Sequence, residues 1–77
     1  MNRLKDLRQD KDMYQRDIAK ILDMSQTGYS QYETETNDIP TDILKKLSLF
    51  YDTSIDYILG ITNEKKPYPR ANLPKKK

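Results

Sequence analysis

The chain has 77 residues, of which 35% are hydrophobic and 34% charged, so it can form one small domain. It contains no cysteine and no histidine, which excludes disulfides, thiolate metal sites and histidine-based catalysis. The net charge of +2 is unevenly divided, because residues 1–62 hold eight Lys/Arg against eleven Asp/Glu, whereas residues 63–77 hold six Lys/Arg against one Glu.

Two short helices are predicted in the first third of the chain. Over residues 2–9, Leu4 and Leu7 are spaced so that both face inward. A polar loop follows, and residues 15–22 then place Ile18 and Leu22 on an apolar face. Asp23 begins a predicted tight turn, and aspartate tolerates the positive φ that such a turn often needs.

The third predicted helix, Gln26–Glu33, carries uncharged hydrogen-bonding side chains on one face. Ser25 is its predicted N-cap, because a serine hydroxyl accepts a hydrogen bond from the first turn. At 100° per residue, one arc of about 140° contains only such side chains: Gln26, Thr27, Ser30, Gln31 and Thr34. Tyr29 and Tyr32 fall on the opposite side, where we expect core and rim. Glutamine both donates and accepts hydrogen bonds, so this face suits the edges of base pairs.

The rest of the chain predicts two more helices and a tail. Residues 40–51 begin with a proline that suits a first helical turn, and their apolar residues recur at helical spacing. Ser54 is the predicted N-cap of a last short helix that ends at Gly60. Residues 63–77 contain three prolines and six of the fourteen Lys/Arg residues. We therefore expect a flexible basic tail after a domain of residues 1–62.

This pattern resembles the helix-turn-helix of the Cro/C1-type, or XRE-like, transcriptional regulators. The resemblance extends through Glu33 and Pro40 to residues 54–60, and it is carried in the motif by Gln15, Ile18, Ala19, Leu22, Met24, Tyr29 and Tyr32. It implies an all-α fold, namely a five-helix lambda-repressor-like DNA-binding domain. Two places depart from the family pattern: Asp23 stands where glycine is usual, and Glu35 and Asp38 stand where the family often has lysine or arginine.

The resemblance also implies roles for particular residues. In the family, an arginine in the first helix pairs with the glutamate that ends the recognition helix, which here predicts a structural ion pair between Arg8 and Glu33. The predicted base contacts lie on the recognition helix Gln26–Glu33 and are Gln26, Thr27, Ser30 and Gln31. The predicted phosphate contacts lie on both sides of that helix and are Gln15, Arg16, Thr36 and Asn37.

The expected function is therefore sequence-specific binding of double-stranded DNA in the major groove, as a regulator that represses transcription. A palindromic operator and a homodimer are expected from the family, with Tyr57, Ile58 and Ile61 either in the dimer interface or closing the monomer's own core. The alternative is a protein-interaction module on the same scaffold, an antitoxin or anti-repressor, which the acidic Glu35 and Asp38 favour.

Other classes of function have no support in the residues. The chain has no glycine-rich phosphate loop and no acidic cluster with metal spacing, so we expect neither an enzyme nor a metal, cofactor or small-molecule site. No apolar run approaches the ~20 residues of a membrane span, and the first residues do not resemble a signal peptide. A cytoplasmic protein of bacterial or phage origin is the expectation by resemblance.

Overall fold

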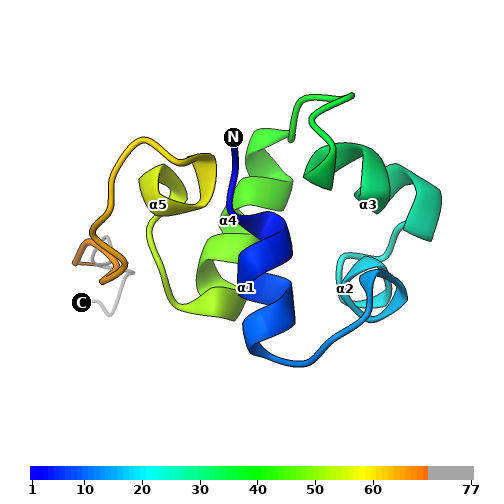
Figure 1. The fold of residues 1–77 in the computed structure, drawn as a ribbon, viewed down its shortest axis with the longest axis horizontal. Coiled ribbons are helices and arrows are strands. Elements are labelled where there is room, and N and C mark those ends of the chain that lie inside the picture. Colours follow the sequence, from blue (N-terminus) through cyan, green and yellow to red (C-terminus); the bar gives the residue numbers. More distant parts are fainter. Residues whose placement is uncertain (70–77) are drawn as a thin grey trace, which may run out of the picture.

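The computed structural model describes residues 1–69, and these residues form five α-helices without a β-strand (Figure 1). In chain order the helices are α1 (Leu4–Asp10), α2 (Gln15–Ile21), α3 (Gln26–Glu33), α4 (Thr41–Tyr51) and α5 (Ile55–Leu59). The predicted all-α fold is confirmed, and α3 has the predicted bounds. The first helix begins at Leu4 rather than at residue 2, because Asn2 and Arg3 make contacts with other helices. None of the helices among residues 1–69 is long and apolar enough to span a bilayer.

The helices pack around one apolar core that draws residues from all five of them. Helices α1 and α4 lie at the centre of the molecule, with α2 and α3 at one end and α5 at the other (Figure 1). The buried apolar residues are Leu4, Leu7, Ile18, Ala19, Leu22, Tyr29, Ile43, Leu47, Tyr51 and Ile58. Tyr29 is fully buried, as its place on the inner side of α3 predicts, and Tyr32 packs partly buried against it.

Several of the helix ends are set by residues that the sequence singles out. The Ser25 hydroxyl accepts a hydrogen bond from the Gly28 N–H at 3.0 Å, and the Ser54 hydroxyl accepts one from the Tyr57 N–H at 3.0 Å. Asp23, with φ of 58°, and Gly60, with φ of 82°, have the left-handed backbone expected at these turns. The serines therefore start α3 and α5, while Asp23 and Gly60 end α2 and α5.

For Ile58 the structure decides between the two alternatives that the sequence leaves open, a dimer interface or the monomer's own core. Ile58 is fully buried in the core of its own monomer, so it cannot lie in an exposed interface, whereas Ile61 is 71% exposed. The chain that follows α5 folds back along it. The hydroxyl of Thr53, just before α5, donates a hydrogen bond to the Lys65 carbonyl, and the Tyr68 hydroxyl donates one to Asp56 at 2.7 Å. The first part of the predicted tail thus lies against α5, and its remainder, residues 70–77, lies outside the described residues.

Candidate functional site

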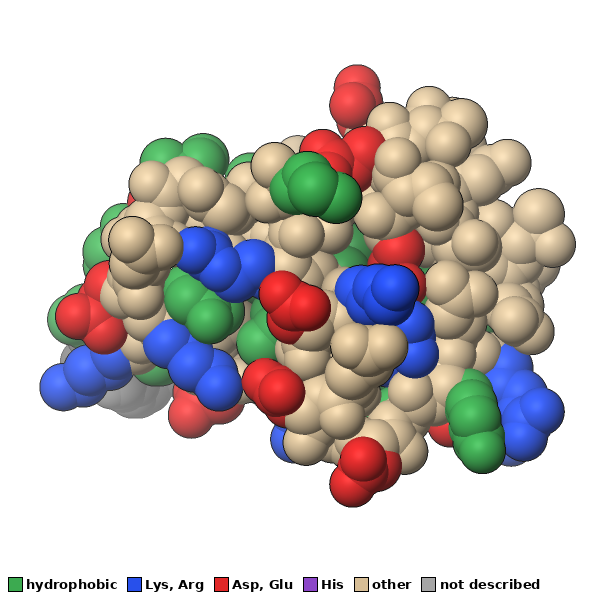
Figure 2. All heavy atoms as spheres, in the orientation of Figure 1, with side chains coloured by type: hydrophobic (Ala, Val, Ile, Leu, Met, Phe, Trp, Pro, Cys, Tyr) green, Lys and Arg blue, Asp and Glu red, His purple; other side chains and the backbone are tan. Residues whose placement is uncertain are grey.

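The uncharged face of α3 is exposed at the end of the molecule opposite α5. Gln26 and Thr27, in the first turn, are exposed, and Ser30 and Gln31, one turn later, are half-buried. Figure 2 shows this end of the molecule covered mainly by uncharged side chains and backbone. The four residues predicted to contact bases therefore lie together on one helix, with the first two most accessible.

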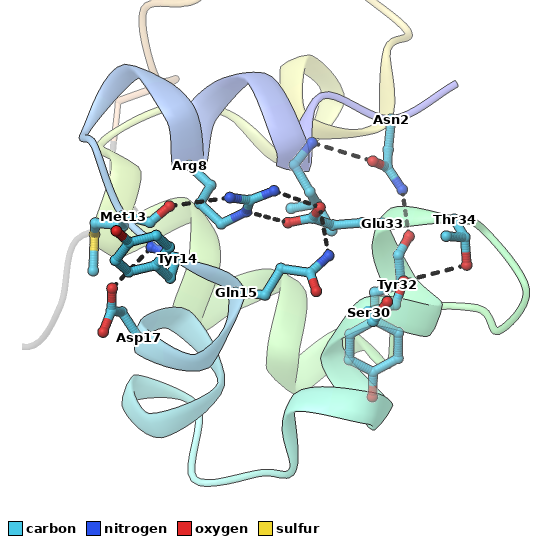
Figure 3. A network of polar contacts seen from close by, with 11 residues as sticks. Asn2, Arg8, Met13, Tyr14, Gln15, Asp17, Ser30, Tyr32, Glu33 and Thr34 are labelled. Carbon is cyan, nitrogen blue, oxygen red and sulfur yellow. Dashed lines mark hydrogen bonds and ion pairs between the residues drawn. The ribbon is translucent and has the colours of Figure 1, made fainter.

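A largely buried ion pair connects the end of α3 to α1 (Figure 3). The Arg8 Nε atom lies 2.7 Å from Glu33 Oε2 and its Nη2 lies 3.0 Å from Glu33 Oε1, so the guanidinium binds the carboxylate through two parallel hydrogen bonds. The two side chains are only 11% and 5% exposed. Arg8 also donates to the Met13 carbonyl at 3.0 Å. The pair implied by the family resemblance is present, and it ties α1 to the last residue of α3.

The ion pair holds both of its members in their charged forms. Burial on its own would raise the pKa of the Glu33 carboxyl, but hydrogen bonds from Arg8 and Gln15 outweigh burial and hold that pKa below its ordinary value. The hydrogen bond to Glu33 raises the pKa of Arg8. Glu33 is therefore an anion at neutral pH, and its contact with Arg8 ties the end of α3 to α1.

Two of the predicted phosphate contacts, Gln15 and Arg16, lie at the start of α2. Their side chains have different partners. The Gln15 amide donates to Glu33 Oε1 at 3.1 Å, so one of its two N–H groups is engaged inside the protein (Figure 3). Arg16 is exposed, and its guanidinium carbon lies 4.7 Å above the centre of the exposed Tyr14 ring. Arg16 is thus the better placed of the two to meet a phosphate.

The loop after α3 places the other two predicted phosphate contacts beside the uncharged face of that helix. Thr36 and Asn37 are exposed, and the Asn37 amide donates to Gln31 Oε1 at 2.6 Å. The Thr36 and Thr34 hydroxyls share a hydrogen bond of 2.9 Å. Glu35 has a left-handed backbone, with φ of 64°, a conformation that the sequence does not predict for glutamate. The structure therefore places the Asn37 amide on Gln31, while Gln26 is exposed at the start of α3.

Asn2 belongs to this site although sequence reasoning missed it. Its side-chain amide donates to the Tyr32 carbonyl in the last turn of α3 at 2.8 Å (Figure 3). Its backbone N–H donates to Glu35 Oε2 at 3.1 Å. In the structure Asn2 precedes α1, where asparagine is a recognisable capping residue, but the sequence pattern places it inside the predicted helix of residues 2–9. Nothing in the sequence indicates a partner 30 residues away.

Comparisons with known proteins support the same assignment of the fold. A family model described as helix-turn-helix matches residues 4–58. YobD, an uncharacterized HTH-type transcriptional regulator of Bacillus subtilis (strain 168), is 36% identical over 72 residues, which cover 92% of this chain and 64% of YobD. ImmR, an HTH-type transcriptional regulator of the same organism, is 41% identical over 58 residues, which cover 75% of this chain and 46% of ImmR. The chain thus spans less than two thirds of either relative. No solved structure gives a significant match.

Proposed function

This chain belongs to the helix-turn-helix family, and on that premise we propose that it is a sequence-specific regulator of transcription that binds double-stranded DNA through α3. The observation that carries the proposal is the exposed, uncharged face of α3, rich in amides and hydroxyls, on a helix whose end is tied to α1 by a largely buried ion pair. Both relatives are named HTH-type transcriptional regulators, which supports the same function.

In the proposed complex, α3 lies in the major groove with its amino-terminal side chains on base edges, while α2 rests against the backbone. Gln26 and Thr27 are the leading base contacts because they are the most exposed, and Ser30 and Gln31 follow. A free glutamine amide matches adenine best, since adenine presents an acceptor at N7 and a donor at N6. Arg16, Gln15, Thr36 and Asn37 are the proposed phosphate contacts.

One recognition helix covers only a few base pairs, so we propose a homodimer on a palindromic operator in the cytoplasm. Its half-sites would be about 34 Å, or one turn of DNA, apart. Repression is the proposed outcome, because a protein bound across a promoter blocks polymerase without further contacts. Selection of duplexes from a random pool tests these points together. A recovered consensus supports DNA reading, its symmetry supports two copies, and failure to enrich any sequence would overturn the proposal.

Direct readout is tested by replacing Gln26 with alanine. We expect binding to the selected duplex to weaken by about 1–3 kcal/mol, because one amide–base pairing is lost, while binding to a scrambled duplex stays nearly unchanged. Gln9→Ala removes an exposed glutamine from α1 and serves as the matched control. Equal losses on both duplexes after Gln26→Ala would show that Gln26 does not read sequence.

The second candidate function is a protein-interaction module, either an antitoxin or an anti-repressor. It is favoured by the exposed carboxylates of Glu35 and Asp38, which flank the end of α3 where a DNA-binding surface usually gains from positive charge. The two functions differ in a mobility-shift experiment with the selected duplex. A salt-sensitive complex with DNA supports the regulator, whereas a protein complex that forms without DNA supports the module.

A further inference from the structure

Residues 1–3 precede α1 and contact both the end of α3 and α5. On one side, Asn2 contacts Tyr32 and Glu35. On the other, the Arg3 backbone N–H donates to the Ile58 carbonyl at 2.8 Å. We call residues 1–3 the N-terminal segment. It therefore connects the carboxyl-terminal end of α3 to α5.

The α5 side of the N-terminal segment is firmly anchored. The Arg3 guanidinium donates to the Tyr57 carbonyl, to the Thr62 carbonyl at 2.8 Å and to Asn63 Oδ1 at 2.8 Å. It also lies over the Tyr57 ring, 4.1 Å from the ring centre. Cation–π contact and several hydrogen bonds to one planar group hold it in a single orientation. The segment is thus fixed to α5 and to the chain that leaves it.

The α3 side depends on the side chain of Asn2. A helix leaves backbone N–H groups without partners at its start. At the end of α3, the Tyr32 carbonyl accepts from the Glu35 N–H at 3.2 Å, and its second lone pair is open to Asn2. Asn2 Oδ1 accepts from the Leu4 N–H at 3.1 Å, at the start of α1, while its Nδ2 donates to the Tyr32 carbonyl at 2.8 Å, at the end of α3. The Asn2 amide offers an acceptor and a donor in one plane, so it links these two helix ends directly.

Asn2 differs from the other supports of α3 because it binds the backbone of the final turn. Ser25 caps the amino-terminal end, and Tyr29 is buried in the core. The Arg8–Glu33 pair holds the last residue through its side chain. We propose that Asn2 is a positioning residue that sets the angle of α3 without touching DNA, and so contributes to base selection. This inference rests on the proposed function, because it concerns how the reading face is presented.

The test compares the full-length chain with its Asn2→Ala and Asn2→Asp variants. Aspartate keeps the acceptor for Leu4 but has no donor for Tyr32, so it isolates the contact with α3. Without DNA, we expect faster amide exchange at Thr34, Glu35 and Asn37, measured by NMR, with little change in α4. With DNA, we expect the ratio of affinities for selected and scrambled duplexes to fall roughly 3- to 10-fold, the equivalent of about one net hydrogen bond.

Two further variants make the result decisive. Asn63→Ala removes an asparagine amide that binds Arg3 on the α5 side of the N-terminal segment. The other Arg3 contacts remain, and we expect the affinity ratio to stay unchanged. The double variant Asn2→Asp with Glu35→Gln removes the repulsion between the new carboxylate and that of Glu35. The affinity ratio should still be low in this variant, because residue 2 still has no donor for the Tyr32 carbonyl. Recovery of the ratio in this double variant, or an unchanged ratio in Asn2→Ala, would overturn the inference. A failure to find any DNA sequence would instead overturn the proposed function, while amide exchange would still report on the contact.

Discussion

At the scale of single residues, Glu33 links the stability of the fold to pH. The guanidinium of Arg8 and the amide of Gln15 both donate to its carboxylate, in a place where water has little access. Removing one partner of such a pair leaves the other charge buried without compensation, which costs more than the pair contributes when intact. Glu33 is therefore more sensitive to substitution than its distance from the exposed reading face suggests.

Replacing Glu33 with glutamine removes the charge and keeps the shape. At pH 7 we expect the free energy of unfolding to fall by about 3 kcal/mol, because the Arg8 charge loses its anion. The pKa of Glu33 lies below its ordinary value of 4.5, so the stabilisation it gives is complete above pH 4.5 and is lost as the pH falls further. The difference in the free energy of unfolding between wild type and Glu33→Gln, measured by urea unfolding, should therefore be smaller at pH 3 than at pH 7.

The matched control for this substitution is Asp38→Asn, which removes an exposed carboxylate and changes the net charge of the chain by the same amount. We expect its effect on unfolding at pH 7 to stay within about 0.5 kcal/mol, as for most surface substitutions. If the free energies of unfolding of wild type and Glu33→Gln differed by the same amount at pH 7 and pH 3, that result would show that the Glu33 charge does not stabilise the fold.

At the scale of elements, the sequence predicts what depends on neighbouring residues and misses what depends on distant ones. Ser25 and Ser54 are readable as caps because the N–H groups they bind lie three residues further along the chain. The Arg8–Glu33 pair spans 25 residues and was available only through the family resemblance. The contact from Asn2 to Tyr32 has no local signal at all, so only the folded chain reveals it.

Gly60 shows the same combination of local and distant causes at the end of α5. Its φ of 82° could be predicted from its place after the helix, but the carbonyl oxygen of Met1 lies 2.4 Å from where a Cβ atom would stand. We expect Gly60→Ala to lower the free energy of unfolding by about 2 kcal/mol, through backbone strain and displacement of the N-terminal segment. Thermal and urea unfolding of the two proteins would measure this.

Asp23→Gly is the matched comparison for Gly60→Ala. Asp23 also has a left-handed backbone, with φ of 58°, so glycine relieves strain there while it increases the freedom of the unfolded chain. We expect the two effects to offset each other to within about 1 kcal/mol. If Gly60→Ala were as mild as Asp23→Gly, neither the φ of Gly60 nor its closeness to Met1 would constrain the fold.

At the scale of the whole molecule, charge is distributed unequally around the proposed reading face. Arg16 and Lys20 are exposed on α2, while Glu35 and Asp38 are exposed in the loop after α3. A DNA backbone would be attracted on the α2 side and repelled on the loop side. The exposed face of α3 between them carries no charge and cannot compensate, so phosphate attraction in the described part of the chain depends heavily on α2.

This asymmetry predicts how salt affects binding. Each phosphate contact made by a cation contributes about −0.9 to the slope of log affinity against log salt concentration. We expect Arg16→Gln to reduce the steepness of that slope by about 0.9 for each bound copy, and to weaken binding to selected and scrambled duplexes equally, because phosphates carry no sequence information.

Lys66→Gln removes an equal charge from the chain after α5, at the opposite end of the molecule from α3 (Figure 1). We expect a smaller change in the slope, which titrations at several salt concentrations would measure for both variants. A slope unaffected by Arg16→Gln would remove Arg16 from the phosphate contacts. A loss confined to the selected duplex would instead make Arg16 a base contact, and the DNA would then have to approach α2 more closely than major-groove docking of α3 alone requires.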